Sequence, residues 1–117
     1  MNKIEQYNVY HELEQNKVSV KNEEHKYIYA DIYYTDTIYS FGPYKIIKTQ
    51  HTEYSKQPSL SYVIMFKNDR PLTCFDSLVV NQMLNAAMNN AKGKPFKKPS
   101  FTPEIIKNVA DYMRQYQ

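Results

Sequence analysis

Glycine and cysteine are scarce in this chain of 117 residues, and each scarcity excludes a class of function. Glycine occurs only at positions 42 and 93, so the sequence holds no glycine-rich loop of the kind that binds phosphate groups. Cys74 is the single cysteine and cannot form an internal disulfide, which predicts a protein of the reducing cytoplasm. Its neighbours Leu72 and Phe75 are apolar and no histidine stands near it in the sequence, so we interpret Cys74 as a buried structural thiol.

Long hydrophobic runs and clustered metal ligands are absent too. No apolar run approaches the roughly 18 residues that a membrane-spanning helix needs, and residues 1–6 have no apolar segment of a secretory signal. His11, His25 and His51 are scattered, and none has a second ligand at metal-binding spacing. Paired carboxylates occur only at positions 12/14 and 23/24, inside polar segments. We therefore expect no membrane association, no cofactor or metal, and no enzymatic activity.

Tyrosine, by contrast, is abundant, with 12 residues, and Lys, Asn and Ile are frequent beside it. An AT-rich genome favours all four through its codons, whatever the function. The apolar share of 42% and the charged share of 23% are close to those of globular proteins, so we expect one folded domain over residues 1–117. A small basic chain rich in Asn and Tyr is similar in composition to accessory proteins of phages and plasmids.

The hydrophobic pattern predicts an α+β fold, with an antiparallel Tyr-rich sheet of three to five strands and two C-terminal helices packed on one face. Residues 60–66 alternate as a strand, and residues 77–91 are apolar at 80, 83, 84, 87, 88 and 91, the spacing of a helix that packs against a core. Asp76 or Ser77 provides the N-terminal cap, and Gly93 stands where a C-terminal cap falls. The segment Thr102-Pro103-Glu104 predicts the start of a second helix over residues 103–116.

The first half of the chain supplies the other strands. Residues 2–15 are apolar at helical spacing (4, 7, 10 and 13) but also alternate as a strand would (7, 9, 11 and 13). We favour the helix, although the acidic residues 12 and 14 stand near the negative end of its dipole. Strands are expected over 18–20, 26–35, 38–41 and 44–51, with turns at 35–37 and 42–43 and a polar loop at 53–58. In strand 26–35, Tyr27, Tyr29 and Tyr33 are expected on the open face of the sheet. The expected core consists of Ile28, Ile32, Ile47, Ile64, Phe66, Val80, Leu84, Met88, Ile105 and Val109.

Three surface features indicate binding rather than catalysis. The connector 92–101 carries four lysines, interleaved with Phe96 and Phe101 and without an acidic residue, so it is either a phosphate-binding segment or a solvated loop. The tyrosines of the sheet are either structural cross-strand pairs or a platform on which bases stack. The side of helix 77–91 opposite its apolar residues is uncharged and rich in carboxamides, which fits contact with a partner or with base edges. These carboxamides are Asn81, Gln82, Asn85, Asn89 and Asn90.

The charge distribution favours an anionic partner. Residues 1–36 contain four Lys and seven acidic residues, whereas residues 37–117 contain eleven Lys or Arg and five acidic residues. The net charge of the whole chain is +3, so residues 37–117 are more positively charged than the chain as a whole.

We therefore predict a non-enzymatic nucleic-acid-binding accessory protein of a phage or other mobile element, with single-stranded nucleic acid as the favoured partner. The predicted phosphate contacts are Lys92, Lys94, Lys97 and Lys98 on the connector and Lys45 and Lys48 on the sheet. The predicted stacking rings are Phe96, Tyr29, Tyr33 and Tyr44. The alternative is an inhibitor or modulator of a host protein that binds through the amide face or an exposed strand edge. A homodimer through an edge strand or the Tyr-rich face is a further hypothesis, because a bare aromatic sheet face is a large patch for a monomer.

Overall fold

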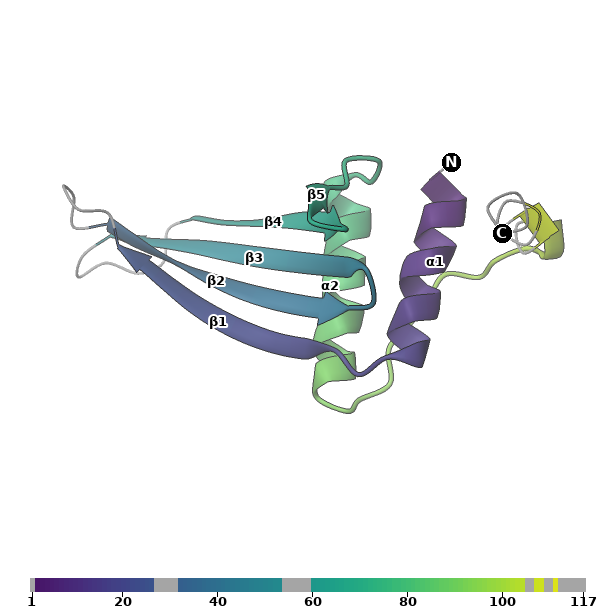
Figure 1. Ribbon diagram of the computed structural model, residues 1–117, viewed down its shortest axis with the longest axis horizontal. Helices are drawn as coiled ribbons and strands as arrows, with labels where there is room; N and C mark the ends of the chain where they lie inside the picture. The colour runs from purple at the N-terminus through teal and green to yellow at the C-terminus, as the bar shows by residue number, and fades with distance from the viewer. Residues whose placement is uncertain (1, 27–31, 54–59, 105–106, 109–110, 112–117) are drawn as a thin grey trace.

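A computed structural model describes residues 2–26, 32–53, 60–104, 107–108 and 111 of the chain (Figure 1). Along the chain, the helix α1 precedes the five strands of one sheet and the helix α2 follows them. The elements are α1 (Asn2–Gln15), β1 (Ser19–Lys26), β2 (Ile32–Phe41), β3 (Tyr44–Glu53), β4 (Leu60–Lys67), β5 (Arg70–Pro71) and α2 (Ser77–Ala91).

The sheet is an antiparallel meander in the order β1-β2-β3-β4-β5, which confirms the predicted α+β class and strand number. Gly42 forms the β2–β3 turn with a positive φ of 54°, as the sequence predicts for this position. Asn68 and Asp69 form the β4–β5 turn with φ of 51° and 62°. A two-residue turn with both φ angles positive matches the right-handed twist of the strands that it joins.

The prediction of two C-terminal helices is wrong, because the sheet is covered by one N-terminal helix, α1, and one C-terminal helix, α2. The helical pattern favoured for residues 2–15 is confirmed, and so is helix 77–91 with Asp76 as its cap. The Asp76 side chain accepts a hydrogen bond from the Val79 N–H at 2.9 Å. Of the predicted helix 103–116, residues 103–104, 107–108 and 111 are helical, and the rest lies outside the described residues.

Two strand boundaries in the first half of the chain differ from the prediction. The edge strand expected over 18–20 continues to Lys26, and the strand expected over 26–35 is divided, because Lys26 ends β1 and pairs with Tyr33 of β2. The turn expected at 35–37 is wrong as well, since these residues lie inside β2 and pair on both sides. Thr35-Asp36-Thr37 has turn-like residues, but Asp36 accepts a hydrogen bond from the Thr49 hydroxyl across the β2–β3 pair.

The two faces of the sheet have different roles. On the face toward the helices, Tyr39, Phe41, Tyr44, Ile46 and Met65 pack with α1 and α2 in one core. From α1 the core includes Val9, Tyr10 and Leu13, and from α2 it includes Val80, Met83, Leu84, Ala86 and Ala87. The other face, here called the open face, carries the odd-numbered residues of β1 and β3 and the even-numbered residues of β2 and β4.

The core prediction is confirmed on α2 and wrong on the central strands. Val80 and Leu84 are buried, and Met88 is partly buried against the core. Ile47, Ile64 and Phe66 lie on the open face instead, while their neighbours Ile46 and Met65 fill the core. Both faces of β3 and β4 are apolar at these positions, so alternation alone does not choose between them. Ile28, Ile105, Val109 and the side chain of Ile32 lie outside the described residues.

Asn90 of α2 fastens the end of α1 to the start of β1. Its side-chain amide donates hydrogen bonds to the carbonyls of Leu13 at 2.7 Å and Asn16 at 3.0 Å. Its side-chain oxygen accepts a hydrogen bond from the Val18 N–H at 2.9 Å. These three bonds satisfy backbone groups that the end of a helix leaves without partners. We call this arrangement the Asn90 clamp.

The sheet extends far beyond the helices, so the molecule is elongated, with dimensions of 52 × 28 × 22 Å. In Figure 1, α2 crosses the strands near the β2–β3 turn and α1 lies beside α2, while the strands continue to the opposite end without a helix over them. The half of the sheet nearest the β2–β3 turn therefore builds the core, and the other half projects from it.

Candidate functional site

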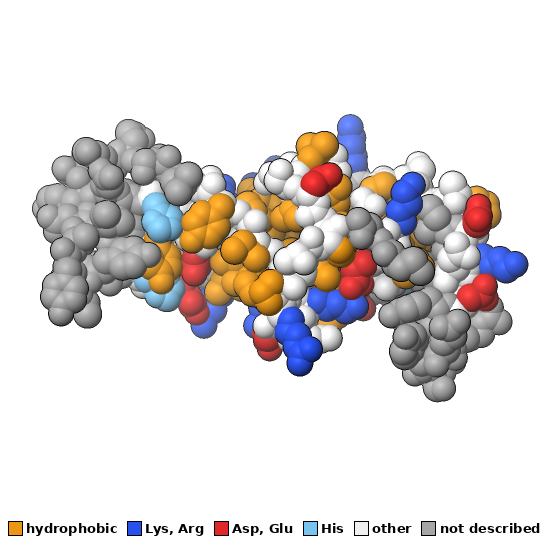
Figure 2. Space-filling view, turned by 90° about the horizontal axis from the view of Figure 1, so that it is seen from above, with side chains coloured by type: hydrophobic (Ala, Val, Ile, Leu, Met, Phe, Trp, Pro, Cys, Tyr) orange, Lys and Arg blue, Asp and Glu red, His pale blue; other side chains and the backbone are white. Residues whose placement is uncertain are grey.

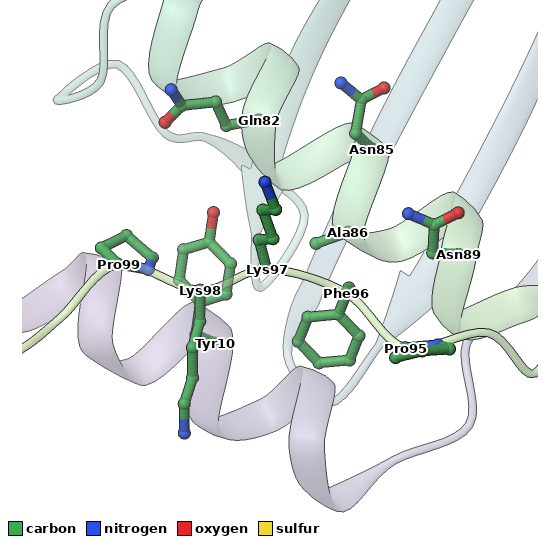
Figure 3. A pocket seen from close by; sticks show the side chains of 10 residues that line it. All are labelled: Tyr10, Gln82, Asn85, Ala86, Asn89, Pro95, Phe96, Lys97, Lys98 and Pro99. Carbon is green, nitrogen blue, oxygen red and sulfur yellow. The ribbon is translucent and has the colours of Figure 1, made fainter.

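A groove of about 790 Å³ lies between α2, α1 and the connector that follows α2 (Figure 3). It joins the two features that the sequence suggests separately, the carboxamide face of helix 77–91 and the basic-aromatic connector. We call it the connector groove. It is lined by Tyr10, Gln82, Asn85, Ala86, Asn89, Pro95, Phe96, Lys97, Lys98 and Pro99.

The connector follows a fixed path because both of its ends are held. At its start, Gly93 has a positive φ of 71°, and the N–H groups of Gly93 and Lys94 bond to the carbonyls of Asn90 and Asn89 at 2.9 and 2.8 Å. This pair of bonds is the Schellman arrangement that ends many helices at a glycine. Farther along, Phe96 and Phe101 pack against the core, and the Phe101 ring meets the Tyr7 ring edge to face with centroids 5.2 Å apart.

The carboxamides of α2 divide into structural and free groups. Asn90 forms the clamp, and Asn81 donates a hydrogen bond to the Ser77 carbonyl one turn earlier at 2.9 Å. Gln82, Asn85 and Asn89 line the groove, and no described residue forms a hydrogen bond with their side-chain amides. In Figure 3 these three amides stand in a row along α2, above the connector. Their donors and acceptors are free for a ligand.

The groove is basic. No acidic side chain is among its described lining residues, and Lys97 extends from the connector toward α2 (Figure 3). Lys92 and Lys94 are exposed at the start of the connector, whereas Lys98 forms an ion pair with Glu14 of α1 at the edge of the groove. Lys17 belongs to the same cluster, because its ammonium is 3.8 Å from the position that a Cβ on Gly93 would occupy. Three described lysines, Lys17, Lys92 and Lys94, therefore lie near one end of the groove and Lys97 lies along it, and none of the four forms an ion pair with a described residue.

The predicted sheet residues do not join this cluster. Lys45 lies on the open face and forms an ion pair with Asp69 at 2.9 Å, and Lys48 lies on the other face of β3. The prediction of Tyr44 as a stacking ring is wrong, because its side chain is only 1% exposed and its hydroxyl donates a hydrogen bond to Glu5 at 2.8 Å. Tyr29 and the side chain of Tyr33 lie outside the described residues.

The open face carries a row of stacked rings rather than a platform of exposed ones. The rings of His25, Tyr34 and His51 stack across β1, β2 and β3 with centroids 4.7 and 5.6 Å apart, and Tyr62 of β4 continues the row at 5.7 Å. The two faces of the Tyr34 ring lie against the two histidine rings, and the Tyr62 ring meets His51 at a tilt of 39°. A nucleobase stacks on a ring face, and this row therefore gives little support to base stacking on the sheet.

Several other classes of site lack support in the part of the chain that the structure describes. No group of three or more His, Cys, Asp or Glu side chains there is arranged to hold a metal ion. Cys74 is half-buried, and burial raises the pKa of its thiol, so it stays protonated and weakly nucleophilic. No described helix has the length and apolar character needed to cross a membrane.

Comparisons with protein-family models, with curated proteins and with solved structures find no match to this chain. The connector groove is therefore interpreted from its own chemistry. Sequence reasoning missed Tyr10, which lines the groove, and Lys17, which lies near its end. Tyr10 is part of the helical spacing of residues 2–15, but only the packing of α1 on α2 brings it to the groove.

Proposed function

We propose that this protein is a non-enzymatic nucleic-acid-binding protein that holds a single strand in the connector groove. The observation that carries the proposal is the combination of free carboxamides, an aromatic side chain and the unpaired Lys97 in one groove without a described acidic lining residue, with three further unpaired lysines near its end. Nucleic acid offers the matching chemistry, since its phosphates attract lysine and its bases carry hydrogen-bonding edges and apolar faces.

Lysines at the start of the connector supply the attraction to phosphates. Lys92, Lys94 and Lys17 lie at one end of the groove, and Lys97 extends into it. Contacts of this kind give affinity for any sequence, and they weaken as salt rises because bound counterions are released.

The walls of the groove favour an unpaired strand over a duplex. Asn85 and Asn89 carry both donors and acceptors, which are the groups that pair with base edges. Phe96 supplies an aromatic side chain at the floor, although it is also packed against the core. A base enters such a groove only after it leaves its own stack, and an unpaired strand does this at low cost.

A fluorescence-anisotropy titration with labelled single-stranded and duplex oligonucleotides tests the proposal at about 50 mM and 200 mM salt. We expect tighter binding of the single strand and a steep loss of affinity at the higher salt concentration. The double variant Lys94→Glu, Lys97→Glu is expected to lower the affinity roughly tenfold or more for every sequence and to reduce the salt dependence.

Two further variants separate the groove from simple charge attraction. Lys48→Glu changes the charge by the same amount per residue but lies outside the groove, so it is expected to have a smaller effect than either connector substitution. Asn85→Ala with Asn89→Ala removes the free carboxamides and is expected to weaken binding without a change in salt dependence. Absence of binding at the lower salt concentration, where electrostatic attraction is strongest, would rule the proposal out.

The second candidate function is capture of a host protein. The apolar floor of the groove, formed by Ala86, Pro95, Phe96 and Pro99, fits a peptide segment as well as a base. A pull-down from a host lysate, repeated after nuclease treatment, distinguishes the two functions. A specific protein that remains bound after nuclease, together with no affinity for oligonucleotides, favours this second function.

A further inference from the structure

We propose that two copies of this chain associate through their open faces, giving four layers in the order helix, sheet, sheet, helix. The interface is independent of the connector groove, which lies on the helix side of each copy. The argument rests on the arrangement of side chains in rows across the open face, where the strand registers fix which residues stand beside one another.

The central row of the open face is apolar on β2, β3 and β4 and ends on β1 at Lys21, which forms an ion pair with Glu23 at 3.0 Å. Ile38, Ile47 and Ile64 stand side by side on β2, β3 and β4, and Ile64 is 43% exposed. Among the described elements, no helix lies over this row, since α1 and α2 pack on the opposite face. Figure 2 shows histidine, acidic and hydrophobic side chains in successive bands from the end of the sheet toward its middle. An apolar row with polar rows on both sides has the composition of a protein interface.

The rows on either side of the isoleucines differ in chemistry. Toward the projecting end of the sheet stand Glu23, Asp36, Thr49 and Tyr62. Toward the β2–β3 turn stand Ser19, Ser40, Lys45 and Phe66. One flank therefore carries two carboxylates and an aromatic ring, and the other carries two hydroxyls, an ammonium and an aromatic ring.

A two-fold axis along the isoleucine row makes this face complementary to itself. Each isoleucine then meets the same isoleucine of the second copy, and each flank meets the opposite flank. The two Lys21 side chains, each paired with Glu23 of its own copy, face each other at the rim of the interface. Glu23 lies over Ser19 of the second copy, and Asp36 lies over Ser40 of the second copy, one strand away from the second copy's Lys45. Tyr62 lies over Phe66 of the second copy. An interface between identical copies needs such a self-complementary patch. Two sheets packed face to face with their strands nearly aligned are a common arrangement.

A two-fold axis along the strands fits less well. Placed between β2 and β3, such an axis sets the ammonium of Lys21 over the second copy's Ile64 and the carboxylate of Glu23 over its Tyr62, so it covers apolar side chains with charged ones. Pairing through the β1 edge is disfavoured too, because its sequence from Lys21 to Lys26 carries five charged or titratable side chains in six positions, which protects an edge from pairing.

Sedimentation equilibrium of the full chain, together with cross-linking, tests the proposal. We expect a reversible dimer. Ile64→Glu is expected to raise its dissociation constant at least about tenfold, because a carboxylate would be buried at the interface. Leu78→Glu is the matched control, since Leu78 is an exposed apolar residue on α2, 66% exposed, and the dimer constant should stay unchanged.

Cross-linking identifies the axis. On a Cys74→Ser background, Ile64→Cys is expected to give a dimer with a short bis-maleimide, whose span suits the roughly 10 Å between packed sheets. Val20→Cys, which is 46% exposed on the helix-side face, is expected to give none. A native chain that stays monomeric at all concentrations overturns the proposal. A dimer that survives Ile64→Glu, or that cross-links through Val20→Cys but not through Ile64→Cys, also overturns it.

Discussion

At the scale of single residues, the side chain of Asn90 joins α2 to the end of α1 and to the start of β1. Asn90 was predicted as part of a binding surface because it belongs to the uncharged carboxamide side of helix 77–91, but its side chain satisfies three backbone groups instead. Sequence patterns place a residue on a face of a helix, and they do not tell whether another segment lies within hydrogen-bonding distance of it. Gln82, Asn85 and Asn89 have the same chemistry and remain free.

Substitution of Asn90 by Ala is therefore expected to destabilise the fold by about 2–4 kcal/mol, because it leaves two carbonyls and one N–H at the α1–β1 junction without partners. Urea unfolding followed by circular dichroism measures the change. Asn85→Ala, the same substitution on the same helix, is the control and should stay within about 0.5 kcal/mol of the native chain. Equal effects of the two substitutions would contradict the role of the clamp.

At the scale of elements, the sequence predicted α2, β3 and β4 with nearly correct boundaries, because each combines clear periodicity with a cap, a glycine or a turn. It failed for β1 and β2. The five residues between the antiparallel strands β1 and β2 include no glycine, proline or asparagine, and the single turn-forming residue among them, Asp31, stands in an alternating apolar pattern that indicates a strand. The acidic residues 12 and 14 weakened the helical interpretation of α1, yet Glu12 accepts a hydrogen bond from the Asn16 side chain and Glu14 pairs with Lys98 of the connector.

Both halves of the connector groove were identified from the sequence, but their meeting was not. The connector lies along α2 because the Gly93 turn reverses the chain and because Phe96 and Phe101 anchor it to the core. The sequence indicates the glycine cap and the two aromatic residues. The direction in which the chain leaves the cap depends on α1, which is far away in sequence and packs on α2.

The two glycines differ in what surrounds them, and this predicts different costs of substitution. Both have positive φ, so alanine at either position costs about 1–2 kcal/mol. At Gly42 the added Cβ would also collide with the Glu12 carboxylate, which accepts a hydrogen bond from the Asn16 side chain. Gly42→Ala is therefore expected to be more destabilising than Gly93→Ala. Thermal unfolding of the two variants measures the difference, and a larger effect at Gly93 would contradict it.

At the scale of the whole molecule, the core is unusually rich in tyrosine, and this links stability to pH. Burial raises the pKa of Tyr10 and Tyr39, and burial together with the hydrogen bond to Glu5 raises the pKa of Tyr44 far above its usual value of 10.0. Below that value these side chains are neutral in both the folded and the unfolded chain, and stability is fully present. Above it the unfolded chain ionises first, so stability falls as pH rises.

We therefore expect the urea midpoint to be constant below about pH 9 and to decrease steadily toward pH 12. The ultraviolet absorbance of tyrosinate provides the second measurement. The buried tyrosines should ionise together with unfolding. Ionisation of every tyrosine near pH 10 with the fold intact would be inconsistent with a core built on these rings.

The Asn90 clamp also has a consequence for the order in which the chain becomes native during its synthesis. The helix α1 leaves the ribosome first, but the residue that holds its last turn is added 74 residues after Asn16. At translation rates of about 5–20 residues per second, this delay lasts about 4–15 s. Throughout that interval Val9 and Leu13 have no α2 against which to pack. The nascent N-terminal segment therefore keeps these apolar side chains exposed until α2 emerges, and exposed apolar surface of this kind is what chaperones bind.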